Sequence, residues 1–284
     1  MADLIPLTLA FMGSRPDAAA QVLEDMPAED AAALFAQVPA RVGADVLRRM
    51  AAFSAARCLE TLPAERGAGL LRELPFVDAV TFFRNLAPGV RTAISDDLPA
   101  NLARDLRIAV TYPVGTVGAV MDQAAVSVTA ARTVDEVAKL VKRRRRKTTD
   151  HLFVVDDDGR FMGTVRAGDL LRADGKTRID DLMDKAVAPL SNRATLASVL
   201  GNPQWNSYLA LPVIGRTGNF LGALNRAALG AGLAELRRGR RSAVDGADSL
   251  MGNLITAYLL ACAGIVRTVA HIGDPAPGTI GEPE

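Results

Sequence analysis

The sequence predicts an α plus α/β chain: an all-α superhelical solenoid of short helices, then a tandem pair of small α/β domains, then a C-terminal apolar helix. Three observations lead to this prediction. A twelve-residue repeat fills residues 25–108, a second pattern occurs twice with an offset of 59 residues, and 18 uncharged residues lie between Asp248 and Arg267. The predicted domain boundaries are 1–111, 112–175, 176–235 and 236–284.

The solenoid prediction rests on the twelve-residue repeat. Each unit is apolar at its second position, and its third position is proline in five of seven units: Pro27, Pro39, Pro63, Pro75 and Pro99. Proline cannot continue a helix but fits its first turn, so each unit predicts one helix of eight or nine residues. Such helices are too short to be stable alone and must stack. The alternative, a bundle of longer Ala-rich helices, would place prolines in helix interiors at about 3 kcal/mol each.

The tandem pair begins where the helical pattern stops. In the stretch TYPVGTVGAVMD, Pro113 and Gly115 interrupt the repeat, which marks a domain boundary near residue 112. Four positions then recur after 59 residues: Gly159, Phe161, Gly163 and Leu170 as Gly218, Phe220, Gly222 and Leu229. In both copies an apolar run, 152–155 or 209–214, precedes the glycine turn. The pattern predicts a duplicated β-hairpin flanked by helices.

The duplicated φφV-D-x-x-G-φ-φ-G pattern after a φ-M-D start resembles a pair of cystathionine-beta-synthase (CBS) domains. A Leu-Pro helical repeat followed by YPVGTVGAVM and such a pair resembles the cytoplasmic part of the MgtE-type magnesium transporter family, over about residues 20–235. The resemblance implies a cytoplasmic sensor in which Mg²⁺ between acidic faces keeps a pore closed and a nucleotide on the CBS pair tunes the response. It also implies that the transmembrane pore domain of the family is lacking from this chain.

The resemblance implies a nucleotide site in the segment G-φ-x-S/T-x-x-D, where a hydroxyl binds phosphate and a carboxylate binds the ribose hydroxyls. The first copy reads GTVRAGD, with Arg166 in the hydroxyl position and Asp169 retained, whereas the second reads GALNRAA. The implied adenine-nucleotide contacts are Asp169, Arg166, Thr164, Tyr208 and Pro212. Asp169 could equally be a helix-capping or surface carboxylate. Trp205 and Tyr208 could stack on adenine, but partial burial in the core is the favoured interpretation.

The resemblance also implies a Mg²⁺ site built from hard oxygen ligands on two surfaces. Its candidate ligands are Asp156, Asp157, Asp158, Asp96 and Asp97. Residues 1–110, however, hold 14 acidic and 11 basic side chains, a net charge of only −3, which weakens the expectation of a Mg²⁺ response. Acidic residues before Gly159 are also typical of a hairpin turn, the favoured interpretation of that triplet.

Charge and composition restrict the partners. Lys plus Arg is 33 against Asp plus Glu 32, and no aromatic platform accompanies the basic run 142–147, so no nucleic acid is expected. The arginines at 237, 238, 240 and 241 precede the apolar segment 249–270. That segment is expected to dock on the same protein or a partner such as a membrane transporter; lying on an anionic membrane, or spanning it, are the alternatives.

The remaining features point to a cytoplasmic, non-catalytic protein. Cys58 and Cys262 lack CxxC spacing, and the N-terminus lacks a positively charged signal region. No Walker loop or GxSxG occurs, and His151 is expected to be structural. The predicted function is regulation or sensing, in a homodimer formed through the CBS pair. A peripheral membrane or assembly scaffold with a purely structural CBS pair is the alternative, and magnesium transport itself is the least favoured.

Overall fold

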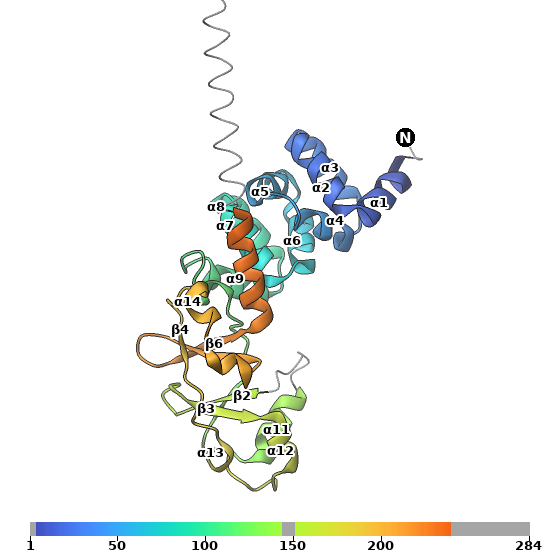
Figure 1. Cartoon of the computed structure of the whole chain (residues 1–284). Helices are drawn as coiled ribbons and strands as arrows, with labels where there is room; N and C mark the ends of the chain where they lie inside the picture. Colours follow the sequence, from blue (N-terminus) through green and yellow to red (C-terminus); the bar gives the residue numbers. More distant parts are fainter. Residues whose placement is uncertain (1–3, 144–150, 240–284) are drawn as a thin grey trace, which may run out of the picture. The chain divides into compact units, whose positions relative to one another are not determined.

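The computed structural model describes residues 4–143 and 151–239 (Figure 1). By internal contacts the chain divides into a unit Met1–Arg237, which holds the elements described below apart from the last two residues of the final helix, and a unit Arg238–Glu284. The predicted apolar helix 249–270, Cys262, most of the basic run 142–147, and Arg240 and Arg241 lie outside the described residues.

Nine short helices occupy residues 4–109 of the described chain. They are α1 Leu4–Ser14, α2 Pro16–Asp25, α3 Ala28–Gln37, α4 Ala40–Leu47, α5 Ala52–Thr61, α6 Ala64–Glu73, α7 Phe76–Asn85, α8 Pro88–Asp97 and α9 Ala100–Ala109. Helices α3 to α9 each begin at the predicted point of the repeat. Pro27, for example, precedes α3 with an extended ψ of 139°. The predicted helix starts are confirmed, although most of these helices reach ten residues rather than eight or nine.

The helices stack in alternation, since α3 packs on α5, α4 on α6, α5 on α7 and α6 on α8. Figure 1 shows this stack from blue to green. Large apolar side chains fill its core, with Phe35, Leu47 and Phe83 fully buried. A Cβ added to Gly67 would lie 2.9 Å from Ile94 Cδ1. The small residue at the seventh repeat position therefore permits the close helix approach that the stacking requires.

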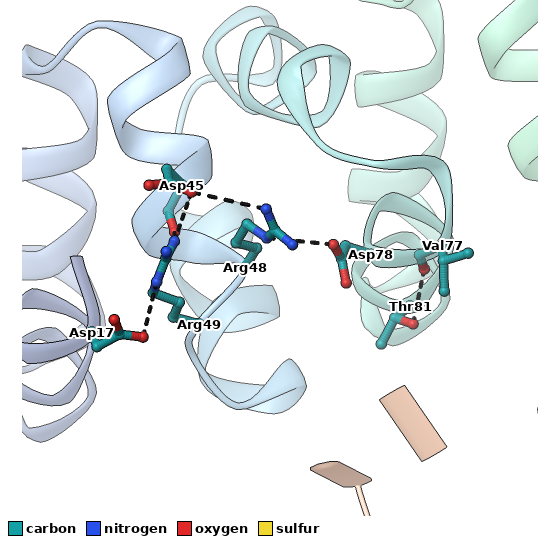
Figure 2. A network of polar contacts seen from close by, with 7 residues as sticks. All are labelled: Asp17, Asp45, Arg48, Arg49, Val77, Asp78 and Thr81. Atoms are coloured by element: carbon teal, nitrogen blue, oxygen red, sulfur yellow. Dashed lines mark hydrogen bonds and ion pairs between the residues drawn. The ribbon is translucent and has the colours of Figure 1, made fainter. Parts of the chain in front are cut away.

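Ion pairs link three of these helices (Figure 2). The Arg49 guanidinium, just after α4, lies 2.9 Å from an Asp17 oxygen on α2 and 2.6 Å from an Asp45 oxygen on α4. Arg48 Nε lies 3.7 Å from Oδ2 of Asp78 on α7. Asp78 is buried, so its carboxylate needs a cation nearby more than the exposed Asp17 does. The network helps to hold α2, α4 and α7 in register.

Two three-stranded sheets follow the helices. Their elements are α10 Val117–Val120, β1 Ser127–Thr129, α11 Val134–Arg143, β2 His151–Val155, β3 Phe161–Arg166, α12 Ala167–Arg172, α13 Ile179–Leu182, β4 Leu190–Ser191, α14 Leu196–Leu200, η1 Pro203–Asn206, β5 Ala210–Ile214 and β6 Phe220–Asn225, then a helix over residues 226–239. The strand orders are β1-β2-β3 and β4-β5-β6. In each sheet the first pair is parallel and the hairpin is antiparallel.

The two sheets repeat each other in detail. Val154 pairs with Gly163 in the first hairpin and Val213 with Gly222 in the second, and a register shift follows at the same place in both. The hairpin turns both contain a glycine with positive φ, +77° at Gly159 and +82° at Gly218. The duplicated hairpin predicted from the 59-residue offset is therefore confirmed, and with it the predicted fold class of the described residues.

Candidate functional site

A cluster of polar side chains gathers around Asp184, which lies in the loop between α13 and β4. We call His151, Thr164, Arg166, Asp184 and Tyr208 the Asp184 cluster. The Asp184 and Thr164 backbones exchange two hydrogen bonds, of 2.9 and 2.8 Å. Tyr208 Oη donates a hydrogen bond of 2.7 Å to Asp184 Oδ2, and the Ala186 amide donates one of 2.8 Å to Oδ1. The loop, β3 and the residue two before β5 are thereby fixed to one another.

Both partners of the central hydrogen bond have shifted acidity. The hydrogen bond from Tyr208, followed by the amide of Ala186 and the charges of Arg166 and His151, lowers the pKa of the Asp184 carboxyl, and burial opposes this only in part. The same hydrogen bond and burial raise the pKa of the Tyr208 hydroxyl. At neutral pH Asp184 is therefore an anion and Tyr208 a neutral donor, which is the combination that their short contact requires.

The inner side of the cluster is closed to solvent. His151 is 6% exposed, and its ring centroid lies 5.5 Å from that of Tyr208, at an interplanar angle of 58°. Thr164 is 1% exposed, and no described residue makes a hydrogen bond with its Oγ1. A buried hydroxyl without a partner is uncommon in folded proteins. The Thr164 hydroxyl is thus a free polar group at the base of the cluster.

Three of the five residues proposed to contact a nucleotide, Thr164, Arg166 and Tyr208, lie in this cluster. Asp169 lies on α12, three residues after Arg166, and its half-exposed carboxylate is 3.2 Å from Arg172 Nη1. Pro212 is buried in β5 and pairs with Ala223. Their roles in binding stay predictions. Trp205 is buried and donates a hydrogen bond of 2.8 Å to the Val199 carbonyl, in agreement with the core position favoured for it.

Sequence reasoning missed the central residue, Asp184. It noticed the φ-M-D start of each copy only as a marker of the duplication, and not as a polar group at a site. The repeated Met-Asp pair, at Met121-Asp122 and Met183-Asp184, was the available signal. His151 was interpreted as structural, and its buried ring against Tyr208 agrees with that interpretation.

The candidate Mg²⁺ ligands occupy separate places. Asp156 Oδ1 accepts a hydrogen bond of 2.7 Å from the Arg160 amide, as the hairpin-turn interpretation predicts. Asp157 and Asp158 are exposed in that turn, and Asp96 and Asp97 are exposed at the end of α8. Within residues 4–143 and 151–239, no group of three or more His, Cys, Asp or Glu side chains could hold a metal ion. The metal-ligand assignment stays a prediction.

The duplication creates a second position equivalent to the Asp184 cluster, centred on Asp122. The Asp122 and Ala223 backbones exchange hydrogen bonds of 2.7 and 3.0 Å, and the Ala124 amide donates one of 2.9 Å to Asp122 Oδ1. The side chains differ, because Asn225 replaces Arg166 and Ala228 replaces Asp169 after the offset of 59. The Asp122 position therefore keeps the backbone hydrogen bonds of the Asp184 cluster without the arginine and the carboxylate found there at 166 and 169.

Comparisons with known proteins agree with this architecture. Residues 14–115 match the MgtE intracellular N domain, and residues 117–176 match the CBS domain. The curated protein "Magnesium transporter MgtE" of Thermus thermophilus is 26% identical over 147 residues, which are 51% of this chain and 33% of that protein. The chain thus spans about a third of the length of this relative.

Two solved structures share the fold. The cytosolic domain of the Mg²⁺ channel MgtE in complex with ATP aligns with a TM-score of 0.60 at 23% identity, covering 78% of this chain and 98% of that one. The soluble part of a magnesium transporter aligns with a TM-score of 0.55 at 16% identity, covering 82% and 98%. Within the part of the chain that the structure describes, no helix is long and apolar enough to cross a membrane.

Proposed function

Because this chain carries an MgtE intracellular N domain followed by a CBS domain, we propose that it is a non-catalytic regulatory module that binds one adenine nucleotide at the Asp184 cluster. Binding would change the affinity of the chain for a partner, either a membrane transporter or an anionic membrane surface. The module would act in the cytoplasm as a homodimer joined through its CBS pair, with Mg²⁺ as a second effector.

The geometry of the cluster supports a nucleotide as the ligand. Arg166 is exposed at the end of β3, and Asp169 follows three residues later in the first turn of α12, so a guanidinium and a carboxylate come from neighbouring elements at the edge of the cluster. A guanidinium pairs with phosphate through charge-assisted hydrogen bonds, and a carboxylate accepts both hydroxyls of a ribose. The ATP in the cytosolic MgtE structure supports the same ligand class. The arrangement of Arg166 and Asp169 is the observation on which the proposal rests.

The binding step needs no chemistry on the nucleotide. Asp169 would exchange its exposed ion pair with Arg172 for the ribose hydroxyls, and such a pair contributes little in water. The buried Thr164 hydroxyl would gain a hydrogen-bond partner. Since Thr164 is bonded through its backbone to Asp184, a ligand on β3 would stabilise one placement of the α13–β4 loop. A nucleotide would shift the equilibrium between two placements of this loop only as far as it binds one placement more tightly than the other.

A second candidate function, a scaffold with a purely structural CBS pair, is favoured by the Tyr208–Asp184 hydrogen bond. This bond satisfies both side chains without a ligand. The two functions differ in what nucleotides do to the chain. A scaffold would show the same melting temperature with and without nucleotides.

Calorimetric titration separates these functions. ATP, ADP, AMP and adenosine are titrated with and without MgCl₂ into the wild-type chain and into the variants Arg166→Ala and Asp169→Asn. Asp25→Asn, an exposed carboxylate at the end of α2, is the matched control. We expect at least one nucleotide to bind and each site variant to weaken it by about tenfold or more, because each removes a charged hydrogen-bond partner. Absence of binding heat and of any change in melting temperature with all four ligands would contradict the proposal.

A further inference from the structure

A cavity of about 470 Å³ lies at the Asp122 position, within the range typical of small-molecule sites. Its walls come from the start of α7, from α9, from residues 120–123, and from the end of β6 with the helix that follows it. Apolar side chains form most of the lining, among them Phe76, Leu102, Val120 and Met121. The helical domain thus borders the Asp122 position and leaves a partly open cavity there.

The polar groups of the cavity are mainly hydrogen-bond acceptors. Asp105 is only 5% exposed; its Oδ1 accepts both hydrogen bonds from Arg104, and no described residue donates to its Oδ2. Gln123 donates through Nε2 to the Asp105 carbonyl at 3.1 Å, so its Oε1 remains for a ligand. Asn225 Oδ1 accepts from the Ala228 amide at 2.7 Å, so only its amide donors remain. With the Asp122 carboxylate added, most polar atoms of the lining are acceptors, so the cavity favours a ligand rich in N–H donors.

The charge of the lining separates this cavity from the Asp184 cluster. No lysine, arginine or histidine is among the residues that line it, whereas two carboxylates are. A phosphate would therefore meet like charge at the lining, because Arg104, which does not line the cavity, already donates to Asp105 Oδ1. A Mg²⁺ ion needs about six oxygen ligands or retained waters, and among the described residues no group of three or more His, Cys, Asp or Glu side chains could hold a metal ion. We propose that this cavity binds a small organic ammonium compound with an apolar body, whose ammonium group pairs with Asp105. This proposal does not depend on nucleotide binding at the Asp184 cluster.

The test measures the binding of three small molecules of similar shape, which differ in their polar group, to the full chain. Phenethylamine carries an ammonium group, 2-phenylethanol a hydroxyl and phenylacetate a carboxylate. We expect saturable binding and a raised melting temperature with phenethylamine, weaker binding with the alcohol, and none with phenylacetate. Asp105→Asn should weaken phenethylamine binding by about tenfold or more, since it removes a charge-assisted hydrogen bond. Asp25→Asn, an exposed carboxylate at the end of α2, should leave that binding unchanged.

A second variant covers the case in which Asp105→Asn unfolds the helical domain. Ala231 lines the cavity, and Ala231→Leu would fill part of it without changing a charge. We expect this variant to lose phenethylamine binding without a lower melting temperature. Asp169→Asn should bind phenethylamine like the wild type, which separates this proposal from the nucleotide site. The proposal is overturned if phenethylamine does not bind, if it binds no better than phenylacetate, or if both cavity variants bind it unchanged. A response to MgCl₂ alone that Asp105→Asn removes would also overturn it.

Discussion

The Asp184 cluster and the Asp122 position have the same backbone hydrogen bonds but different side chains. Each has a Met-Asp pair whose aspartate exchanges two backbone hydrogen bonds with the second hairpin strand, and each aspartate accepts from the amide two residues later. Only the Asp184 cluster adds an arginine and a tyrosine, while the Asp122 position is bordered by α7 and α9. Duplication therefore preserved the contacts that hold the sheets, and the side chains at the two positions diverged.

The largest expected effect tests the shared backbone. Gly222 has φ of +156°, and a Cβ there would overlap the Asp122 carbonyl; at Gly163 a Cβ would lie 2.6 Å from the Asp184 carbonyl. We expect Gly222→Ala to lower the free energy of unfolding by about 3 kcal/mol, because strain and a backbone clash combine. Gly163→Ala should lower the free energy of unfolding by less, because the φ of Gly163 is not in the left-handed region. Urea unfolding of both variants measures this. Equal, small losses would show that the Met-Asp segments move away easily.

The next effect belongs to the Asp184 cluster alone. Tyr208→Phe removes the hydrogen bond to the Asp184 carboxylate, and we expect a loss of about 1.5 kcal/mol in the free energy of unfolding at pH 7. Tyr112→Phe is the matched control, because Tyr112 is partly buried against a hydrophobic cluster and no described residue makes a hydrogen bond with its hydroxyl. Thermal and urea unfolding measure the stability of both variants. A loss at Tyr112 as large as that at Tyr208 would assign the effect to general packing.

The same hydrogen bond predicts a pH dependence. The folded-state pKa of Asp184 lies below its unfolded value, so its contribution to stability is present above pH about 4 and is lost as the pH falls through the folded pKa. Tyr208 has a raised pKa, so its contribution is present below pH about 10 and is lost above it. We therefore expect the stability difference between wild type and Tyr208→Phe to be largest near neutral pH. A difference that stays constant from pH 3 to pH 7 would contradict this assignment.

The smallest expected effect concerns Thr164, whose counterpart at the Asp122 position is Ala223. Thr164→Val removes the buried hydroxyl that has no partner among the described residues. Without ligand, the stability should be unchanged or higher by up to about 1 kcal/mol. Nucleotide affinity should fall, because the hydroxyl is proposed to gain its partner from the ligand. A clear loss of stability without ligand would show that the hydroxyl is already satisfied, for example by water.

Local patterns predicted much of the fold. Proline at the third repeat position determines where α3, α4, α6, α7 and α9 begin, because a proline is accepted in the first turn of a helix and not in its interior. The 59-residue offset located both hairpins, since a glycine turn between apolar runs leaves few alternatives. These features depend on neighbours within a few residues, which a single sequence displays.

The two candidate sites were harder to predict because they depend on contacts distant in sequence. Asp184 receives its hydrogen bond from Tyr208, 24 residues later, and no local pattern marks either as a partner. The cavity joins Phe76 and Leu102 of the helical domain with Ala228. The resemblance singled out Thr164, Arg166 and Asp169; the first two lie in the Asp184 cluster, and the role of all three in nucleotide binding stays a prediction.

The central claim is that the Asp184 cluster and the Asp122 position have the same backbone hydrogen bonds, but that only the Asp184 cluster binds a nucleotide. Equilibrium dialysis with radiolabelled ATP counts the nucleotides bound per chain in the wild type, Asp169→Asn and Asp122→Asn. We predict one ATP per chain in the wild type and Asp122→Asn, and strongly weakened binding in Asp169→Asn. Two ATP per chain, or binding that Asp122→Asn removes and Asp169→Asn leaves intact, would contradict the account.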